Sequence, residues 1–429
     1  MTDVTPRPRV GNRILGSRRA AWLAFALVHG WLAWVCLFVP HDGMKDVSVV
    51  YRQWVEQALD GGVVIGIDTA WVYPVLAIVP MLVAAVFGTT QYVAVWVALV
   101  VVVNAVAFAF AVTSARIRAA WWWLAFLVVL GPIALARIDA ITVSLGIVGV
   151  LLLATRPRAA GTVLAIAAWV KVWPAVLIAA AIVTMRSRGR ILFYGVVVSV
   201  IVVIVALVLG SGARVFSFIT EQTGRGLQVE APVTTFWLWA AFAGQPGAGV
   251  YFDGQIITYQ VTGAGVDVAA AVMTPLLVAV VAVILVLGFR AVRGGAPAAQ
   301  VLPSLVLALV VAVIAVNKVG SPQFISWIAV PIVLGLATHG ASFRTPAVLA
   351  LMIAGLTQVI YPYLYGSLIE LHPAMLVALT VRNILEFVLL GWAVAALVRL
   401  GHPQSGDPHP DLPQSGLPQS QHPQSKVVS

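Results

Sequence analysis

The chain has 429 residues, of which 61% are hydrophobic and only 9% are charged, and its formal net charge is +10. Because soluble domains carry about 25% charged residues, this composition excludes a water-soluble globular protein and predicts a chain whose main solvent is lipid. The basic residues stand in short clusters between apolar runs, which excludes a nucleic-acid-binding surface and is typical of membrane proteins.

The N-terminal part predicts a cytoplasmic arm followed by a membrane span. Five arginines within residues 1–19 precede the first apolar run, residues 20–40, and place this arm in the cytoplasm. The run has the length of a span, and no small-residue cleavage site follows it, so we expect a retained span rather than a signal peptide. Residues 41–71 are rich in charge and predict a first external loop, with a short amphipathic helix over residues 47–59.

Further apolar runs predict that the chain crosses the bilayer repeatedly. They cover residues 72–88, 91–113, 119–136, 140–155, 161–184, 191–210, 267–289, 299–316, 323–338, 346–361 and 374–398. At about 20 residues per span, these runs and the first one predict an all-α polytopic membrane protein of about 12 transmembrane helices, with both termini in the cytoplasm.

The basic clusters test the parity of this scheme. Arg186, Arg188 and Arg190 fall on the cytoplasmic side, as expected for basic loops, whereas Arg156 and Arg158 fall outside. A break at residues 171–174 would reverse the parity in the middle of the chain, and this alternative stays open.

Two later segments do not have the composition of spans. Residues 211–266 predict a second external loop, in which residues 251–261 alternate like a short hairpin and residues 233–243 are too short to cross. Residues 401–429 repeat Pro-Gln-Ser and predict a disordered tail, because they lack apolar side chains to bury. A single cysteine, Cys36, excludes an intramolecular disulfide.

Ionisable residues in or beside spans are costly and are therefore functional candidates. Asp46 follows the first span and is a candidate general base, although Asp42, Asp60 and Asp68 share its loop and a solvated loop aspartate is the more ordinary interpretation of its position. Lys171 lies within an apolar run between two tryptophans, where it either meets a lipid-linked phosphate or snorkels to the interface.

Other charged positions have competing interpretations. Arg137 and Asp139 occupy a tight turn, where we expect a structural pair that satisfies itself. Arg225 and Glu230 lie in a glycine-containing stretch that lets a guanidinium approach a phosphate, or that forms an exposed flexible loop. Arg382 lies inside the last predicted span, where its partner is a phosphate, Glu370 or Glu386.

Lys318 and Gln323 flank a Ser-Pro helix entry, and Gln323 is placed to bind a sugar hydroxyl or to cap the helix. His41, His339 and His372 are isolated in the sequence, so no metal site is expected.

Several of these segments, taken together and in order, resemble the bacterial glycosyltransferase family 87 of the GT-C superfamily. The matching residues are Asp46, Tyr51, Tyr73, Pro74, Lys171, Trp173, Pro174, residues 225–230, residues 321–327, residues 361–365, Arg382 and Asn383. The ordered set covers most of residues 20–400, which is the expected GT-C-like glycosyltransferase domain.

The resemblance implies a sugar donor on a polyprenyl phosphate, typically decaprenyl-phosphate mannose in actinobacteria, and chemistry on the outer face of the membrane. It implies that Asp46 is the catalytic residue. Binding of the donor phosphate and substrate then falls to the remaining matched or neighbouring polar residues, which are Tyr51, Lys171, Arg225, Glu230, Lys318, Gln323 and Arg382.

One departure concerns the acceptor. The phosphatidylinositol mannoside mannosyltransferases of this family carry a histidine pair just after the tryptophan of the Ser-Pro segment, but here residues 328–331 are Ile-Ala-Val-Pro. The acceptor and the sugar therefore stay open.

The expected function is transfer of a sugar, with mannose favoured, from a polyprenyl-phosphate donor to a cell-envelope glycolipid or glycan, with inversion and with neither metal nor cofactor. The partners are then the lipid-linked donor, the acceptor and membrane lipids. The alternative is a transporter or flippase of polyprenyl-linked lipids, against which stand the two unequal external loops and the lack of an internal repeat.

Overall fold

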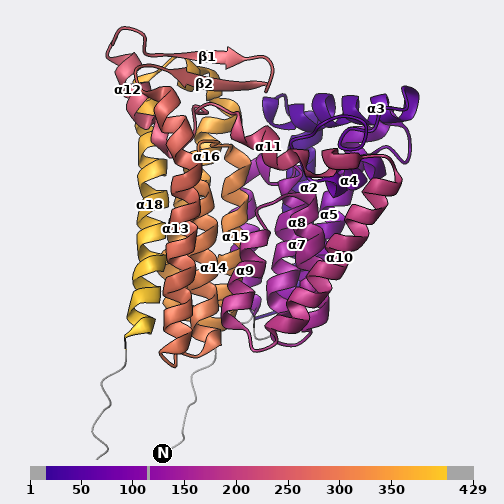
Figure 1. The fold of residues 1–429 in the computed structure, drawn as a ribbon, viewed down its shortest axis with the longest axis vertical. Helices are drawn as coiled ribbons and strands as arrows, with labels where there is room; N and C mark the ends of the chain where they lie inside the picture. The colour runs from indigo at the N-terminus through magenta and orange to yellow at the C-terminus, as the bar shows by residue number, and fades with distance from the viewer. Residues whose placement is uncertain (1–15, 114–115, 403–429) are drawn as a thin grey trace, which may run out of the picture.

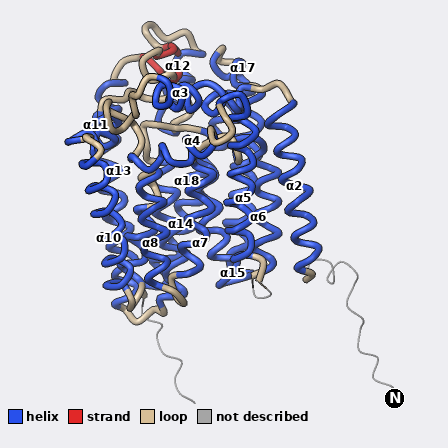
Figure 2. The backbone as a smooth tube through the Cα atoms, turned by 90° about the vertical axis from the view of Figure 1, so that its right-hand side faces the viewer, coloured by secondary structure: helices blue, strands red, loops and turns tan. Residues whose placement is uncertain are grey.

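The computed structural model describes residues 16–113 and 116–402, so most of the predicted basic arm and disordered tail lie outside the described residues. The described chain is a bundle of roughly parallel helices with short elements gathered at one end (Figure 1). We call the end that carries α3 and the strands the upper face, and the opposite end the lower face. Figure 2 shows the short strands lying above the helices at the upper face.

The bundle helices lie between the two faces. They are α2 (Arg18–Phe38), α5 (Tyr92–Ala111), α6 (Ile117–Leu130), α7 (Asp139–Leu152), α8 (Pro157–Val170), α9 (Ala175–Thr184), α10 (Arg188–Val208), α13 (Val266–Arg293), α14 (Ala298–Ala315), α15 (Ala329–His339), α16 (Arg344–Gln358) and α18 (Pro373–Gly401).

Eight helical segments of the described chain are long and apolar enough to cross a bilayer, which confirms an all-α polytopic membrane protein. The expected twelve spans are not confirmed. Helices α7, α8 and α9 have 14, 14 and 10 residues, short of the roughly 20 that a span needs. Residues 72–88, expected to span, form only a 3₁₀ turn (Val75–Ala77) and the short α4 (Ile78–Ala84).

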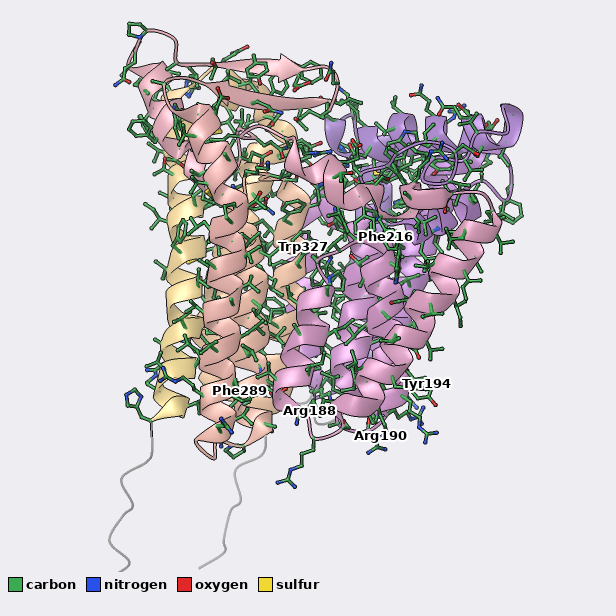
Figure 3. All side chains as sticks on the ribbon, viewed as in Figure 1. Arg188, Arg190, Tyr194, Phe216, Phe289 and Trp327 are labelled. Atoms are coloured by element: carbon green, nitrogen blue, oxygen red, sulfur yellow. The ribbon has the colours of Figure 1, made fainter. Side chains whose placement is uncertain are left out.

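The predicted span over residues 161–184 is wrong, because the chain breaks there into α8 and α9. Lys171 adopts an extended backbone with φ −154° and ψ 139°, and Pro174 three residues later cannot donate the hydrogen bond that would continue the helix. The break also changes the side of the bundle on which α8 begins, compared with the expectation from the sequence. Arg158, at the start of α8, lies 5.9 Å from the ring centroid of Tyr194, which Figure 3 places at the lower face with Arg188 and Arg190.

The upper face is built from the two predicted loop regions. Asp46–Tyr51 and α3 (Arg52–Asp60) form a continuous helix, which confirms the expected short surface helix. Strands β1 (Gly249–Asp253) and β2 (Thr258–Thr262) form an antiparallel hairpin with Tyr251 opposite Gln260, which confirms the expected hairpin. Short helices complete this face: α11 (Ser217–Thr223), α12 (Thr235–Phe242) and α17 (Tyr365–Ile369).

The core lies where two groups of helices meet. The N-terminal group, α2 to α10, and the C-terminal group, α13 to α18, stand side by side in Figure 1. Helix α15 packs against α6 and α7, and α14 packs against α9. Helices α13 and α10 are mostly exposed, as expected for the lipid-facing rim, whereas α14 is buried over most of its length.

A buried polar network joins three helices of the N-terminal group. The Asn104 side chain lies 3.1 Å from His29 Nε2, and the Ser144 hydroxyl donates to Asn104 Oδ1 at 2.5 Å. Hydrogen bonds of this kind hold helices together in an apolar medium. The sequence analysis did not single out His29, because its neighbours in the sequence are apolar.

Small residues allow the close packing of α8 on α10. A Cβ on Gly161 would overlap the backbone of Ile191. We therefore expect Gly161→Ala to cost about 1–3 kcal/mol of stability and to lower the apparent melting temperature in detergent. Gly195→Ala, on the same helix pair, would place its Cβ no closer than 3.9 Å to other atoms and is the matched control. Equal melting curves for the two variants would contradict this packing.

Candidate functional site

Charged side chains gather near the upper face, at the boundary between the two helix groups. Figure 3 places Trp327, which belongs to this cluster, in the upper half of the bundle at that boundary. The residues come from the turn before α7, the break between α8 and α9, residues 42–60, residues 225–231 and residues 317–327.

Asp46 begins the helix that lies on the upper face, and its partner is Arg137, 91 positions later in the chain. Arg137 Nε lies 2.9 Å from Asp46 Oδ2, and the two side chains are 5% and 34% exposed, respectively. Asp46 is therefore accessible from the upper face while its partner is buried. The other acids of this segment have local or surface contacts: Asp42 pairs with Lys45, and Glu56 with Arg52.

The two terminal nitrogens of Arg137 also donate hydrogen bonds. Arg137 Nη1 donates to the carbonyl oxygens of Gly43 and Ala136, and Nη2 donates to the Tyr361 hydroxyl at 2.8 Å. The Tyr361 hydroxyl in turn donates to the carbonyl of Asp42 at 3.3 Å. Arg137 thus connects residues 42–60 to the chain just after α16.

Asp139 and Lys171 form a second ion pair. Lys171 Nζ lies 2.7 Å from Asp139 Oδ2, and the Trp327 indole donates to Asp139 Oδ1 at 2.6 Å. The Lys171 ammonium also lies 5.2–5.8 Å from the ring centroids of Tyr73, Phe324 and Trp327. The Lys171 side chain is 12% exposed and that of Asp139 1%, so a carboxylate and three aromatic rings hold this cation in place.

The expectation that Arg137 and Asp139 satisfy each other is therefore wrong. Each side chain pairs with a residue from another part of the chain, because the turn into α7 directs the guanidinium toward residues 42–60 and the carboxylate toward the break after α8. Their sequence offered one signal that should have been given more weight: charges beside a span need partners, and these two have several possible ones.

Arg225 and Lys318 lie near each other on the C-terminal side of the cluster. Burial lowers the pKa of Arg225, and burial together with the nearby charge of Arg225 lowers the pKa of Lys318. Arg225 Nε is buried without a hydrogen-bond partner among the described residues. The backbone keeps the two segments together, since Gln228 N donates to the Lys318 carbonyl at 3.0 Å. Two crowded, partly desolvated cations favour an anion.

Tyr73 connects these cations to the rest of the cluster. It lies within electrostatic range of Asp46, Lys171 and Asp139 on one side and of Arg225 on the other. The structure therefore brings together Asp46, Lys171 and Arg225, three of the residues that the sequence analysis selected.

Arg382 and Glu230 form an ion pair with each other. Arg382 Nη1 lies 3.3 Å from Glu230 Oε2, and Arg382 Nη2 donates to the Glu230 carbonyl at 2.5 Å. Arg382 Nε lies 3.4 Å from Glu386, which confirms one of the expected partners. All three side chains are buried. These contacts give Arg382 and Glu230 a structural role in joining residues 225–231 to α18, and neither is used in the phosphate site proposed below.

Tyr51 and Gln323 are both buried near the cluster. The Tyr51 hydroxyl accepts a hydrogen bond from the backbone of Ile138 at 3.4 Å, in the turn that carries Arg137 and Asp139. Gln323 lies in the 3₁₀ segment Pro322–Ile328 that also carries Trp327. Both residues border the site, and their predicted contacts with substrate stay predictions.

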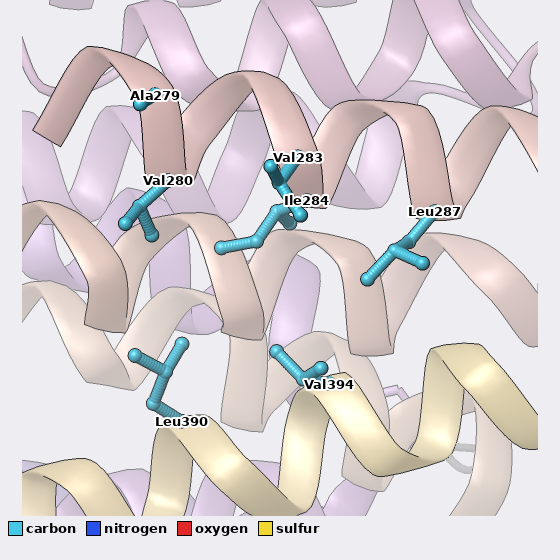
Figure 4. Close-up of a pocket in the computed structure, with 7 residues that line it drawn as sticks. All are labelled: Ala279, Val280, Val283, Ile284, Leu287, Leu390 and Val394. Carbon is cyan, nitrogen blue, oxygen red and sulfur yellow. The ribbon is translucent and has the colours of Figure 1, made fainter. Parts of the chain in front are cut away.

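The apolar groove between α13 and α18 is a separate feature. It is lined by Ala279, Val280, Val283, Ile284, Leu287, Leu390 and Val394 (Figure 4). It contains no side chain that can bind a charge or transfer a proton. We therefore place the chemistry at the charged cluster and treat this groove as lipid-facing surface.

The cluster thus combines an accessible carboxylate held by a buried arginine with an adjacent group of cations. A carboxylate of this kind can accept a proton, and the cations can stabilise a phosphate anion. Comparison with models of known protein families finds no match to the chain, and a search among curated proteins finds no relative. The resemblance to glycosyltransferase family 87 therefore stays a prediction.

The Glu230 contact predicts a pH-dependent stability. Burial raises the pKa of Glu230 from 4.5 to about 7, Arg382 opposes this rise, Glu386 adds to it, and a hydrogen bond with Tyr365 opposes it. A raised folded-state pKa contributes stability that is full below the unfolded value and is lost as the pH rises through the folded value. We therefore expect the apparent melting temperature to fall between about pH 5 and about pH 8.

Glu230→Gln should flatten this dependence, because the amide does not ionise. Glu56→Gln is the matched control, since Glu56 lies on the surface helix α3 and pairs with its neighbour Arg52. Melting curves of wild type and Glu230→Gln with the same slope against pH would exclude Glu230 as the group responsible.

Proposed function

We propose that this protein is a membrane glycosyltransferase that moves a sugar, with mannose favoured, from a polyprenyl-phosphate donor to a glycolipid or glycan acceptor. The observation that carries the proposal is a partly exposed carboxylate, Asp46, that is paired with Arg137 and lies in the same cluster as the cations Lys171 and Arg225, at one end of a membrane bundle. A lipid-linked phosphate needs such cations at membrane depth, and a hydroxyl acceptor needs such a base.

In the proposed reaction, the acceptor hydroxyl oxygen attacks the anomeric carbon of the sugar from the side opposite the phosphate. The bond between that carbon and the phosphate oxygen breaks, and the polyprenyl phosphate leaves as an anion. Asp46 accepts the hydroxyl proton, and Lys171, Arg225 and Lys318 stabilise the charge on the leaving group. A single displacement of this kind inverts the anomeric configuration.

The charge distribution supports an external active site. Arg188 and Arg190 lie at the lower face, with Arg158 beside Tyr194 at the same level. Positively charged loops face the cytoplasm in multi-pass membrane proteins. We therefore propose that the upper face, which carries Asp46, is the outer face of the cell membrane and that both termini are cytoplasmic.

Asp46→Asn tests the proposed base. With membranes that contain the full chain and radiolabelled decaprenyl-phosphate mannose, wild type should label a lipid or glycan acceptor. The variant should lose about 10²–10⁴-fold in turnover while donor binding stays unchanged, because the amide cannot accept the proton. Turnover by both forms would remove Asp46 from the mechanism.

The same assay separates the enzyme from the transporter or flippase, which remains the alternative. If neither form transfers sugar, donors with other polyprenyl-linked sugars are tested next. Movement of a labelled lipid across proteoliposomes without sugar transfer would replace the proposal. The buried ion pair between Asp139 and Lys171 is the feature that such a transporter would use.

The reaction should need no divalent metal. The leaving group is already a phosphate ester anion, and Lys171, Arg225 and Lys318 supply the positive charge that a metal would otherwise provide. Transfer should therefore persist in EDTA. Loss of activity in EDTA and its recovery on adding Mg²⁺ or Mn²⁺ would contradict the assignment of this role to the three side chains.

A further inference from the structure

We propose that Arg137 is a positioning residue that fixes the Asp46 carboxylate for proton transfer. This inference rests on the proposed function, in which Asp46 is the general base. Arg137 belongs to the turn before α7, and no feature of the sequence connects it with residue 46. Only the folded chain brings the two side chains to 2.9 Å.

The geometry leaves one face of the base open. Arg137 holds Oδ2 of Asp46, whereas Oδ1 has no hydrogen-bond partner among the described residues. The side chain of Asp46 is 34% exposed, so a hydroxyl can approach from the upper face. An arginine that orients one oxygen of a carboxylate while the other stays accessible holds that carboxylate in position to accept a proton, since catalytic groups must be held within a narrow range of positions.

Arg137 is itself held rigidly. Its guanidinium donates to the carbonyls of Gly43 and Ala136 and to the Tyr361 hydroxyl, so contacts from three separate parts of the chain fix its plane. Its side chain is almost completely buried. A buried guanidinium whose two terminal nitrogens make these hydrogen bonds cannot rotate away from Asp46 without leaving polar groups unpaired.

Arg137 combines a planar fork of donors with a positive charge, and two substitutions separate these properties. Glutamine removes the charge, whereas lysine keeps the charge but lacks the planar fork.

The test compares Arg137→Gln and Arg137→Lys in steady-state sugar transfer. For Arg137→Gln we expect kcat to fall about 10²-fold with the donor KM changed by less than about threefold. For Arg137→Lys we expect a smaller fall in kcat, about tenfold.

Arg52→Gln is the control, because Arg52 pairs with Glu56 on the surface of α3 and lies outside the proposed site. A merely structural role for Arg137 predicts less folded protein with unchanged kinetic constants per folded molecule. That result, or wild-type kcat in Arg137→Gln, would overturn the proposal.

A second readout does not depend on activity. Asp46 should react faster with a water-soluble carbodiimide and an amine in Arg137→Gln than in wild type, measured by peptide mass against Asp42 as the internal reference. Equal reactivity would overturn the positioning role even if the enzyme is active. If wild type transfers no sugar but the reactivity of Asp46 rises, the proposed function fails while the structural link between the two residues stands.

Discussion

The arrangement of this protein depends on pairing a few charges inside an apolar bundle. A charge in a membrane bundle needs a partner because water is absent there. Arg137 and Asp139, two residues apart in one turn, find theirs in Asp46 and Lys171. The turn thus fixes residues 42–60 of the upper face on one side and the break between α8 and α9 on the other. The proposed base and one proposed phosphate ligand are placed by the same three residues of backbone.

The upper face is assembled around this turn by both helix groups. Residues 225–229 lie between the hairpin and Lys318, since Val229 N donates to the Tyr259 carbonyl and Gln228 N to the Lys318 carbonyl. A Cβ on Gly320 would overlap the backbone of Glu230 and Ala231, so glycine is required for this close approach. Arg382 then joins the same segment to α18 through Glu230. The ion pairs of Arg137 and Asp139 therefore form the site, whereas the ion pair of Arg382 with Glu230 holds residues 225–231 at the upper face.

The sequence predicted much of the architecture and several members of the site. Apolar runs located the bundle, the alternation at residues 251–261 located the hairpin, and the cost of membrane charges selected Asp46, Lys171, Arg225 and Lys318. Arg382 and Glu230, assigned to donor phosphate or substrate binding, pair with each other, and Arg382 also contacts Glu386, one of its expected partners. The sequence analysis failed at Arg137 and Asp139, since a turn with opposite charges looks self-sufficient when the partners are 91 and 32 residues away.

The sequence alone determined that lipid is the solvent, because composition fixes how much apolar surface must avoid water. It offered a helix break at residues 171–174 only as an alternative to a span over residues 161–184, and the structure decided in favour of the break. Only the tertiary structure decided which charges meet, because ion pairing depends on distances between segments far apart in the chain. For the same reason it decided that Arg382 is occupied by carboxylates, while Arg225 and Lys318 crowd each other near Tyr73.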